Sequence, residues 1–127
     1  MYSDIVKDHF TKPRNVGEMD HPDAAGAAKN EADGDHVQLH FQIEDGNIKD
    51  VKMKVMGCVA AIASTSMLTT MIMGMSVDKA LAVTRQNLAA QLGGLPEQKI
   101  HCSLTCLDAL EQALKPFQNK KADINAK

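Results

Sequence analysis

Hydrophobic and polar residues alternate most regularly in the middle of the chain, on both sides of a turn sequence. Odd-numbered residues are apolar and even-numbered residues are polar in residues 37–43, and residues 51–55 repeat this pattern. Such alternation is typical of strands that bury one face, and the intervening Asp45-Gly46-Asn47 is typical of a tight turn. The pattern therefore predicts an antiparallel β-hairpin.

The register of this hairpin follows from the parity of its apolar positions. Because these positions are odd-numbered on both strands, facing residues must have numbers with an even sum, which requires an odd-length loop or a bulge. A three-residue turn at Asp45–Asn47 gives a sum of 92. That register places Asp35 opposite Gly57 and leaves Asp33 just beyond, so we expect both acids close to Cys58 at one end of the sheet.

Outside the hairpin, apolar residues follow helical spacing. A short helix is predicted over Tyr2 to Phe10, which Pro13 must end, and Lys12 to Gly26 is predicted as loop. A longer helix is predicted from Ala60 to Met73, with Gly74 as its stop. Its methionines are expected to fill the core, because thioethers adapt to irregular gaps and no haem or copper motif accompanies them.

Three further helices are expected toward the C-terminus. Ser76 and Thr84 have the residue types that cap helix N-termini, and the second of these short helices should end at Gly93-Gly94. A last helix is predicted from about Ser103, with leucines along its buried face. Pro116 is expected to kink or terminate it.

Composition limits the class of protein. The 127 residues are 44% hydrophobic and 24% charged, which suits one globular domain over residues 1–127. The net charge is −2 and aromatic residues are few, so no nucleic-acid partner is expected. Because no apolar run reaches membrane-spanning length and the N-terminal residues are interspersed with charges, we expect a cytoplasmic protein with no signal peptide and no membrane partner.

Candidate chemistry is concentrated in three segments: Asp33-Gly34-Asp35, Gly57-Cys58, and His101-Cys102 with Cys106 four residues later. Thiolates are soft ligands for zinc and iron–sulfur clusters, and imidazole and carboxylate groups add further donors. Cys58 should also lie at a helix N-terminus, where the partial positive charge favours anionic groups. These residues predict a site that binds metal or handles sulfur.

Each of these residues also has a structural interpretation. A cysteine is often a small buried apolar residue, although cysteines beside glycine or histidine at element boundaries fit that role less well. His101 is as compatible with a structural role as with ligation or proton transfer beside Cys102. The spacing is not that of a zinc finger, because there is no close Cys-x-x-Cys pair.

Several longer motifs occur in the same order as in one protein family. They are Lys12-Pro13-Arg14-Asn15-Val16-Gly17, Gly57-Cys58-x-x-Ala61-Ile62-Ala63-Ser64, Gly74-x-Ser76, Lys99-Ile100-His101-Cys102-Ser103 and Asp108-Ala109-Leu110. With these motifs, which span nearly the whole chain, the sequence resembles the IscU/NifU-type scaffold proteins on which iron–sulfur clusters are assembled.

The resemblance implies a fold and a role. The fold is α+β, a three-stranded antiparallel sheet packed against several helices on one side. The role is that of a scaffold rather than an enzyme, which takes sulfur from a cysteine desulfurase and iron from an iron donor. The family builds a [2Fe-2S] cluster and passes it to acceptor apoproteins. Asp35 matches the aspartate that keeps the cluster labile in this family.

The chain departs from the family pattern at three places. Asp33 stands where the family has its first cysteine ligand, which puts the usual ligand count in question. Residues 95–99 read Leu-Pro-Glu-Gln-Lys, more polar than the family's chaperone-recognition stretch, so an Hsp70-type chaperone is not assumed as a partner. Cys106 stands where the family usually has a small non-ligating residue. On a helix it shares a face with Cys102 and could supply the missing thiolate, but packing in the core is favoured.

We therefore expect a cluster scaffold in which Cys58 and Cys102 are thiolate ligands and His101 or Asp33 completes the shell. Asp35 would keep the site labile, and Cys106 is the least favoured of the candidate ligands. The alternative is a sulfur-transfer protein in which Asp35, Cys58, His101 and Cys102 hold zinc and Cys102 accepts persulfide sulfur. A third possibility is a divergent paralogue that binds the desulfurase without building clusters.

Overall fold

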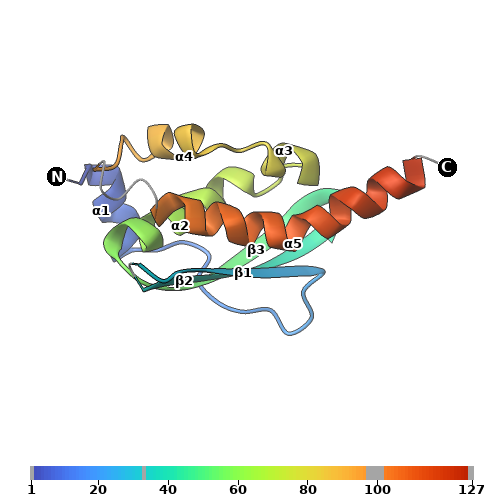
Figure 1. Cartoon of the computed structure of the whole chain (residues 1–127), viewed down its shortest axis with the longest axis horizontal. Coiled ribbons are helices and arrows are strands. Elements are labelled where there is room, and N and C mark those ends of the chain that lie inside the picture. Colours follow the sequence, from blue (N-terminus) through green and yellow to red (C-terminus); the bar gives the residue numbers. More distant parts are fainter. Residues whose placement is uncertain (1, 33, 97–101, 126–127) are drawn as a thin grey trace.

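The computed structural model describes residues 2–32, 34–96 and 102–125. Three strands form one antiparallel sheet in the order β1-β2-β3, with β1 at Ala24–Asn30, β2 at Asp35–Glu44 and β3 at Asn47–Met56. The helices are α1 at Asp4–Thr11, α2 at Val59–Ile72, α3 at Val77–Leu81, α4 at Arg85–Gln91 and α5 at Cys102–Asn125. In Figure 1, α2 and α5 lie over one side of the sheet, with α3 and α4 beyond them. The expected α+β fold is confirmed.

The hairpin has the predicted register over most of its length. From His36 with Met56 to Gln42 with Asp50, facing residues have numbers that sum to 92. The turn, however, has two residues rather than three, because Glu44 pairs with Asn47. Asp45 and Gly46 both have positive φ, 55° and 79°, as in the type I′ turns whose twist suits hairpins.

A bulge reconciles this short turn with the register. The pairing shifts between Gln42 and Ile43, and Ile43 faces Ile48, which makes Lys49 the extra residue. The bulge allows the even-numbered Ile48 to be fully buried together with the odd-numbered Val51. The predicted three-residue turn is therefore wrong, and the alternative of a bulge is the one that the structure adopts.

The first strand was not anticipated from the residues. Lys12 to Gly26 was expected to be loop, but β1 begins at Ala24. Its alanines and glycine give no strand signal, because strand preference lies with β-branched and aromatic residues. A Cβ atom at Gly26 would lie 2.3 Å from the Ala109 carbonyl oxygen and 2.7 Å from the Ala113 nitrogen. Small residues in β1 therefore let α5 approach the sheet closely.

The helices largely follow the sequence signals. Ser76 and Thr84 cap α3 and α4 as predicted, each accepting a hydrogen bond from a backbone N–H of the first turn. Pro116 was expected to kink or terminate the last helix; termination does not occur, because α5 continues through Pro116 to Asn125. Pro116 is exposed, and water can hydrogen-bond the carbonyl that a helical proline leaves without an N–H donor.

The core lies between the sheet and the helices. Leu39 and Phe41 of β2 and Leu68 of α2 are fully buried there. Met67 and Met53 belong to this core, and other methionines pack against it, so the expected packing role is confirmed. In the part of the chain that the structure describes, none of the helices has the length and apolar content needed to span a membrane.

Candidate metal and sulfur site

Asp35 and Cys58 meet at the end of the sheet where β2 begins and β3 ends. Cys58 is the N-cap residue of α2, and Asp35, the first residue of β2, is 1% exposed. The Cys58 backbone N–H donates a 3.0 Å hydrogen bond to Asp35 Oδ1. The other carboxylate oxygen, Oδ2, lies 3.8 Å from the Cys58 Sγ. The hairpin register and the start of α2 therefore place the Asp35 carboxylate next to the Cys58 thiol.

The spacing of these two donor atoms suits a shared metal ion. In a tetrahedral site with zinc–sulfur and zinc–oxygen bonds of about 2.3 and 2.0 Å, the two donors are about 3.5 Å apart. The Sγ and Oδ2 atoms are separated by 3.8 Å, close to that value. A small adjustment of either side chain would let both bind one ion. The donor set is mixed, one soft sulfur and one hard oxygen.

The other predicted ligands are placed less fully. Asp33 and His101 lie outside the described residues, and so does the side chain of Cys102. The backbone of Cys102 begins α5. Figure 1 shows that α2 and α5 both begin at the left-hand end of the molecule, and the two helices pack against each other. Leu95 and Cys58 both pack against the buried cluster of Ala60 and Ala61.

The described residues alone do not complete a metal site. Within residues 2–32, 34–96 and 102–125, no group of three or more histidine, cysteine, aspartate or glutamate side chains could hold an ion together. Asp35 and Cys58 supply two donors. Further ligands would have to come from side chains that the structure does not describe, and those of Cys102, His101 and Asp33 remain the predicted ones.

Cys106 occupies a different environment from Cys58. It is fully buried in the main hydrophobic core and lies on the second turn of α5. Burial raises the pKa of the Cys106 thiol to about 12, although a side-chain hydrogen bond with Thr65 of α2 acts in the opposite direction. This environment favours the interpretation of Cys106 as a core residue.

The loop after α1 is attached to α2 by polar contacts that the sequence analysis missed. His9 Nδ1 lies 2.8 Å from the Ser66 hydroxyl oxygen, which also accepts a 2.9 Å hydrogen bond from the Arg14 backbone N–H. Burial lowers the pKa of His9, and the positive charge of Arg14 lowers it further. The available signal was the run of serine and threonine in the otherwise apolar α2, because buried hydroxyls need partners.

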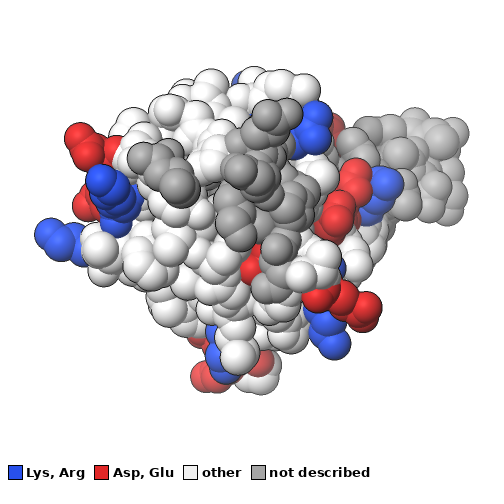
Figure 2. All heavy atoms as spheres, turned by 60° about the vertical axis from the view of Figure 1, so that its left-hand side comes forward, with Lys and Arg blue, Asp and Glu red and all other residues white. Residues whose placement is uncertain are grey.

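Charge on the surface around the site is mixed. Figure 2 turns the end at which α2 and α5 begin toward the viewer, and acidic and basic side chains are interspersed around its margin. Two of the ion pairs on the surface, Arg14 with Asp8 and Lys54 with Glu18, are exposed. No stripe of one sign is visible among the described residues of this face.

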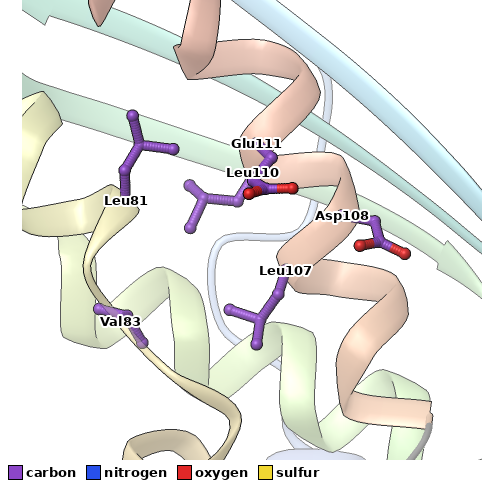
Figure 3. Close-up of a pocket in the computed structure, with 6 residues that line it drawn as sticks. All are labelled: Leu81, Val83, Leu107, Asp108, Leu110 and Glu111. Carbon is purple, nitrogen blue, oxygen red and sulfur yellow. The ribbon is translucent and has the colours of Figure 1, made fainter.

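A separate cavity of about 200 Å³ lies between α5 and the end of α3 with the chain that follows it. Figure 3 shows aliphatic side chains from both sides of this cavity, with two acids on α5. Its lining residues are Leu81, Val83, Leu107, Asp108, Leu110 and Glu111. This lining contains neither sulfur nor imidazole, so the cavity is distinct from the Asp35–Cys58 pair.

Comparisons with known proteins were made for the whole chain. The family model described as the NifU-like N terminal domain matches residues 1–124. "Iron-sulfur cluster assembly scaffold protein IscU 1" of Archaeoglobus fulgidus is 43% identical over 125 residues, which are 98% of this chain and 82% of the relative. "Iron-sulfur cluster assembly scaffold protein IscU" of Haemophilus influenzae is 39% identical over 124 residues, 94% of this chain and 98% of the relative.

A solved structure gives the same result for the fold. The crystal structure of SufU, an iron–sulfur cluster assembly scaffold protein of the SUF system from Fervidobacterium islandicum AW-1, superposes with a TM-score of 0.73. The two chains are 25% identical, and the match covers 89% of this chain and 96% of the other. With the match to the family model over nearly its whole length, this chain belongs to the NifU-like N-terminal domain family.

Proposed function

We propose that this protein is a scaffold on which iron–sulfur clusters are assembled before transfer to other proteins. The observation that carries the proposal is the contact between Asp35 and Cys58, a carboxylate and a thiol 3.8 Å apart at the N-terminus of α2. Relatives that match nearly the whole chain are named as cluster assembly scaffolds, which supports the same role. Residues 1–127 would act as one domain.

The cluster would be held by a mixed set of donors. Cys58 and Cys102 are the proposed thiolate ligands, and His101 or Asp33 would complete the shell. Asp35 would contribute one oxygen, which is a weaker partner for iron in such clusters than a thiolate sulfur and so would keep the cluster easy to release. The proposed cluster is of the [2Fe-2S] type.

The role requires partner proteins rather than catalysis by this chain. We propose that a cysteine desulfurase supplies sulfur, that a separate donor supplies iron and that acceptor apoproteins receive the finished cluster. The reducing conditions of the cytoplasm would suit this chemistry, because they keep thiols available as ligands.

A second candidate is a zinc-bound protein that accepts persulfide sulfur. It is favoured by the donor spacing at Asp35 and Cys58, which is close to that of a tetrahedral zinc site. Here zinc would be held by these two residues with His101 and Cys102, and Cys102 would accept the sulfur. A paralogue that binds the desulfurase without holding metal is the remaining alternative.

Anaerobic purification followed by iron, sulfide and zinc analysis separates these candidates. A [2Fe-2S] scaffold should contain iron and sulfide in about equal amounts after incubation with a desulfurase, cysteine, ferrous iron and a thiol reductant, which supplies the electrons that reduce persulfide sulfur to sulfide. A zinc-bound sulfur acceptor should contain zinc without sulfide, and a non-assembling paralogue should contain neither. Zinc that persists while no sulfide is incorporated would contradict the scaffold proposal.

A further inference from the structure

Gly57 stands between the strand that ends at Met56 and the thiol at Cys58, directly against the buried carboxylate. A Cβ atom added at Gly57 would lie 2.4 Å from Asp35 Oδ1 and 3.1 Å from both Cα and Cγ of Asp35. The first distance is far inside van der Waals contact, so a side chain at this position would force the carboxylate to move. The 3.1 Å distance to Cα shows that the backbone of Asp35 is close as well.

Asp35 has little freedom to move while keeping its present contacts. Its backbone is paired with Asn30 at the start of β2, and its side chain is almost completely buried. Rotation of the side chain is therefore the main adjustment available to it. A rotation that carries Oδ1 clear of an added Cβ at residue 57 would also disturb the 3.0 Å hydrogen bond that Oδ1 accepts from the Cys58 N–H.

The present orientation divides the two oxygens of Asp35 between two tasks. Oδ1 accepts the hydrogen bond from the Cys58 backbone at the start of α2, and Oδ2 faces the Cys58 sulfur. A metal ion bound by the Cys58 sulfur could therefore also bind Oδ2 of Asp35, which lies beside that sulfur. The hydrogen bond to Oδ1 fixes the position of that second oxygen.

We propose that Gly57 is a positioning residue for this site: the absence of a side chain there lets Asp35 reach Cys58 and offer a single oxygen beside its sulfur. The inference rests on the proposed function for its consequence in metal binding, but the contact itself can be tested in the metal-free protein. Gly57 has φ +159°, at the edge of the region that favours glycine, so the test must separate backbone strain from the steric contact.

The test combines Gly57→Ala and Asp35→Ala in a double-mutant cycle. Two measurements are made on each variant: the temperature coefficient of the Cys58 amide proton in ¹H–¹⁵N spectra of the metal-free protein, and the affinity for Co²⁺. Gly46→Ala is the matched control, since φ is +79° there and, among the described residues, no atom lies within 4 Å of the added Cβ. Gly46 is in the hairpin turn, at the other end of β3 from Cys58.

Gly57→Ala should change the temperature coefficient of the Cys58 amide proton to the value that it has in Asp35→Ala, because both changes remove the hydrogen bond to Oδ1. It should weaken Co²⁺ binding about tenfold to a hundredfold, the range typical of lost supporting contacts in metal sites. The double variant should bind Co²⁺ no more weakly than Asp35→Ala alone. Gly46→Ala should lose stability without changing either measurement.

Two results would overturn the inference. One is an unchanged temperature coefficient of the Cys58 amide proton in Gly57→Ala, and the other is a loss of Co²⁺ binding free energy in the double variant equal to the sum of the single losses. If Gly57→Ala does not fold but the double variant does, the result supports the steric contact between the added side chain and Asp35. If neither variant folds, the effect is assigned to backbone strain at residue 57, which contradicts the inference. Failure of the proposed function gives a different result, in which Asp35→Ala and Cys58→Ala bind Co²⁺ as tightly as the unchanged protein.

Discussion

Cys58 and Cys106 contrast in their burial, in their neighbouring groups and in their place in the fold. Cys58 is half-buried at the boundary between β3 and α2, and its neighbour is a carboxylate. Cys106 is fully buried within α5, and its neighbour is the hydroxyl of Thr65. An element boundary exposes backbone N–H groups and leaves room for a ligand, whereas a position inside a packed helix offers neither. Location in the fold, more than residue type, separates the candidate ligand from the core residue.

The contrast is tested most strongly by removing the thiols at the two helix starts. Cys58→Ala and Cys102→Ala should each abolish retention of metal and cluster, because each removes a charged soft donor that water does not replace. Metal analysis and the visible absorbance of the reconstituted cluster measure the effect. Cys106→Ala is the matched control and should retain both. Full metal content in both test variants would refute the assignment of the site.

Restoring a thiol at residue 33 should strengthen the site. Asp33→Cys would add a thiolate, which is a better donor to iron in such clusters than a carboxylate, and should lengthen the lifetime of the cluster in the presence of a chelator. Decay of cluster absorbance is the measurement. As a control, Asp45→Cys places a thiol in the hairpin turn, remote from Cys58 along both strands, and should not change the decay. Equal decay for Asp33→Cys and the unchanged protein would mean that residue 33 is not near the cluster.

Much of the site end of the fold could be predicted from alternation and the position of the turn. The parity of the apolar residues required an even sum, and a turn centred on Gly46 predicted the pairing of His36 with Met56, which brings Asp35 to Cys58. The three-residue turn failed because Ile48 breaks the parity, and a bulge with a two-residue turn buries it. The bulge leaves the site end of the hairpin unchanged, so the error did not spread to the site.

Features that depend on close approach could not be predicted. Strand β1 carries no propensity signal, and its place in the sheet is made possible by the contact between Gly26 and α5. The close approach of Gly57 to Asp35 could not be predicted for the same reason, since it depends on distances between elements rather than on any local sequence pattern. Periodicity predicts which face is buried, but not how closely two backbones approach.

A smaller effect is expected from Cys106 at neutral pH. Cys106→Ala should leave metal content and the reactivity of Cys58 unchanged and should lower the free energy of unfolding by about 1 kcal/mol, because a small cavity replaces the sulfur. Denaturant unfolding and metal analysis are the measurements. A variant that folds normally but loses its cluster would instead make Cys106 the displaced third thiolate.

The last prediction concerns the pH dependence of this same substitution. Because burial raises the pKa of the folded Cys106 thiol from 9.0 to about 12, the unfolded chain loses this proton first as the pH rises. The contribution of Cys106 to stability is therefore complete below pH 9 and declines between pH 9 and 12, by at most about 1.4 kcal/mol per pH unit. Near pH 10 the decline should roughly equal the ~1 kcal/mol cavity cost, so Cys106→Ala and the unchanged protein should have similar free energies of unfolding. Other alkaline groups titrate in both proteins and cancel in the difference. A difference that stays constant from pH 7 to pH 10 would show that the Cys106 thiol ionises as readily in the folded protein as in the unfolded chain, and the contrast with Cys58 would then not rest on burial.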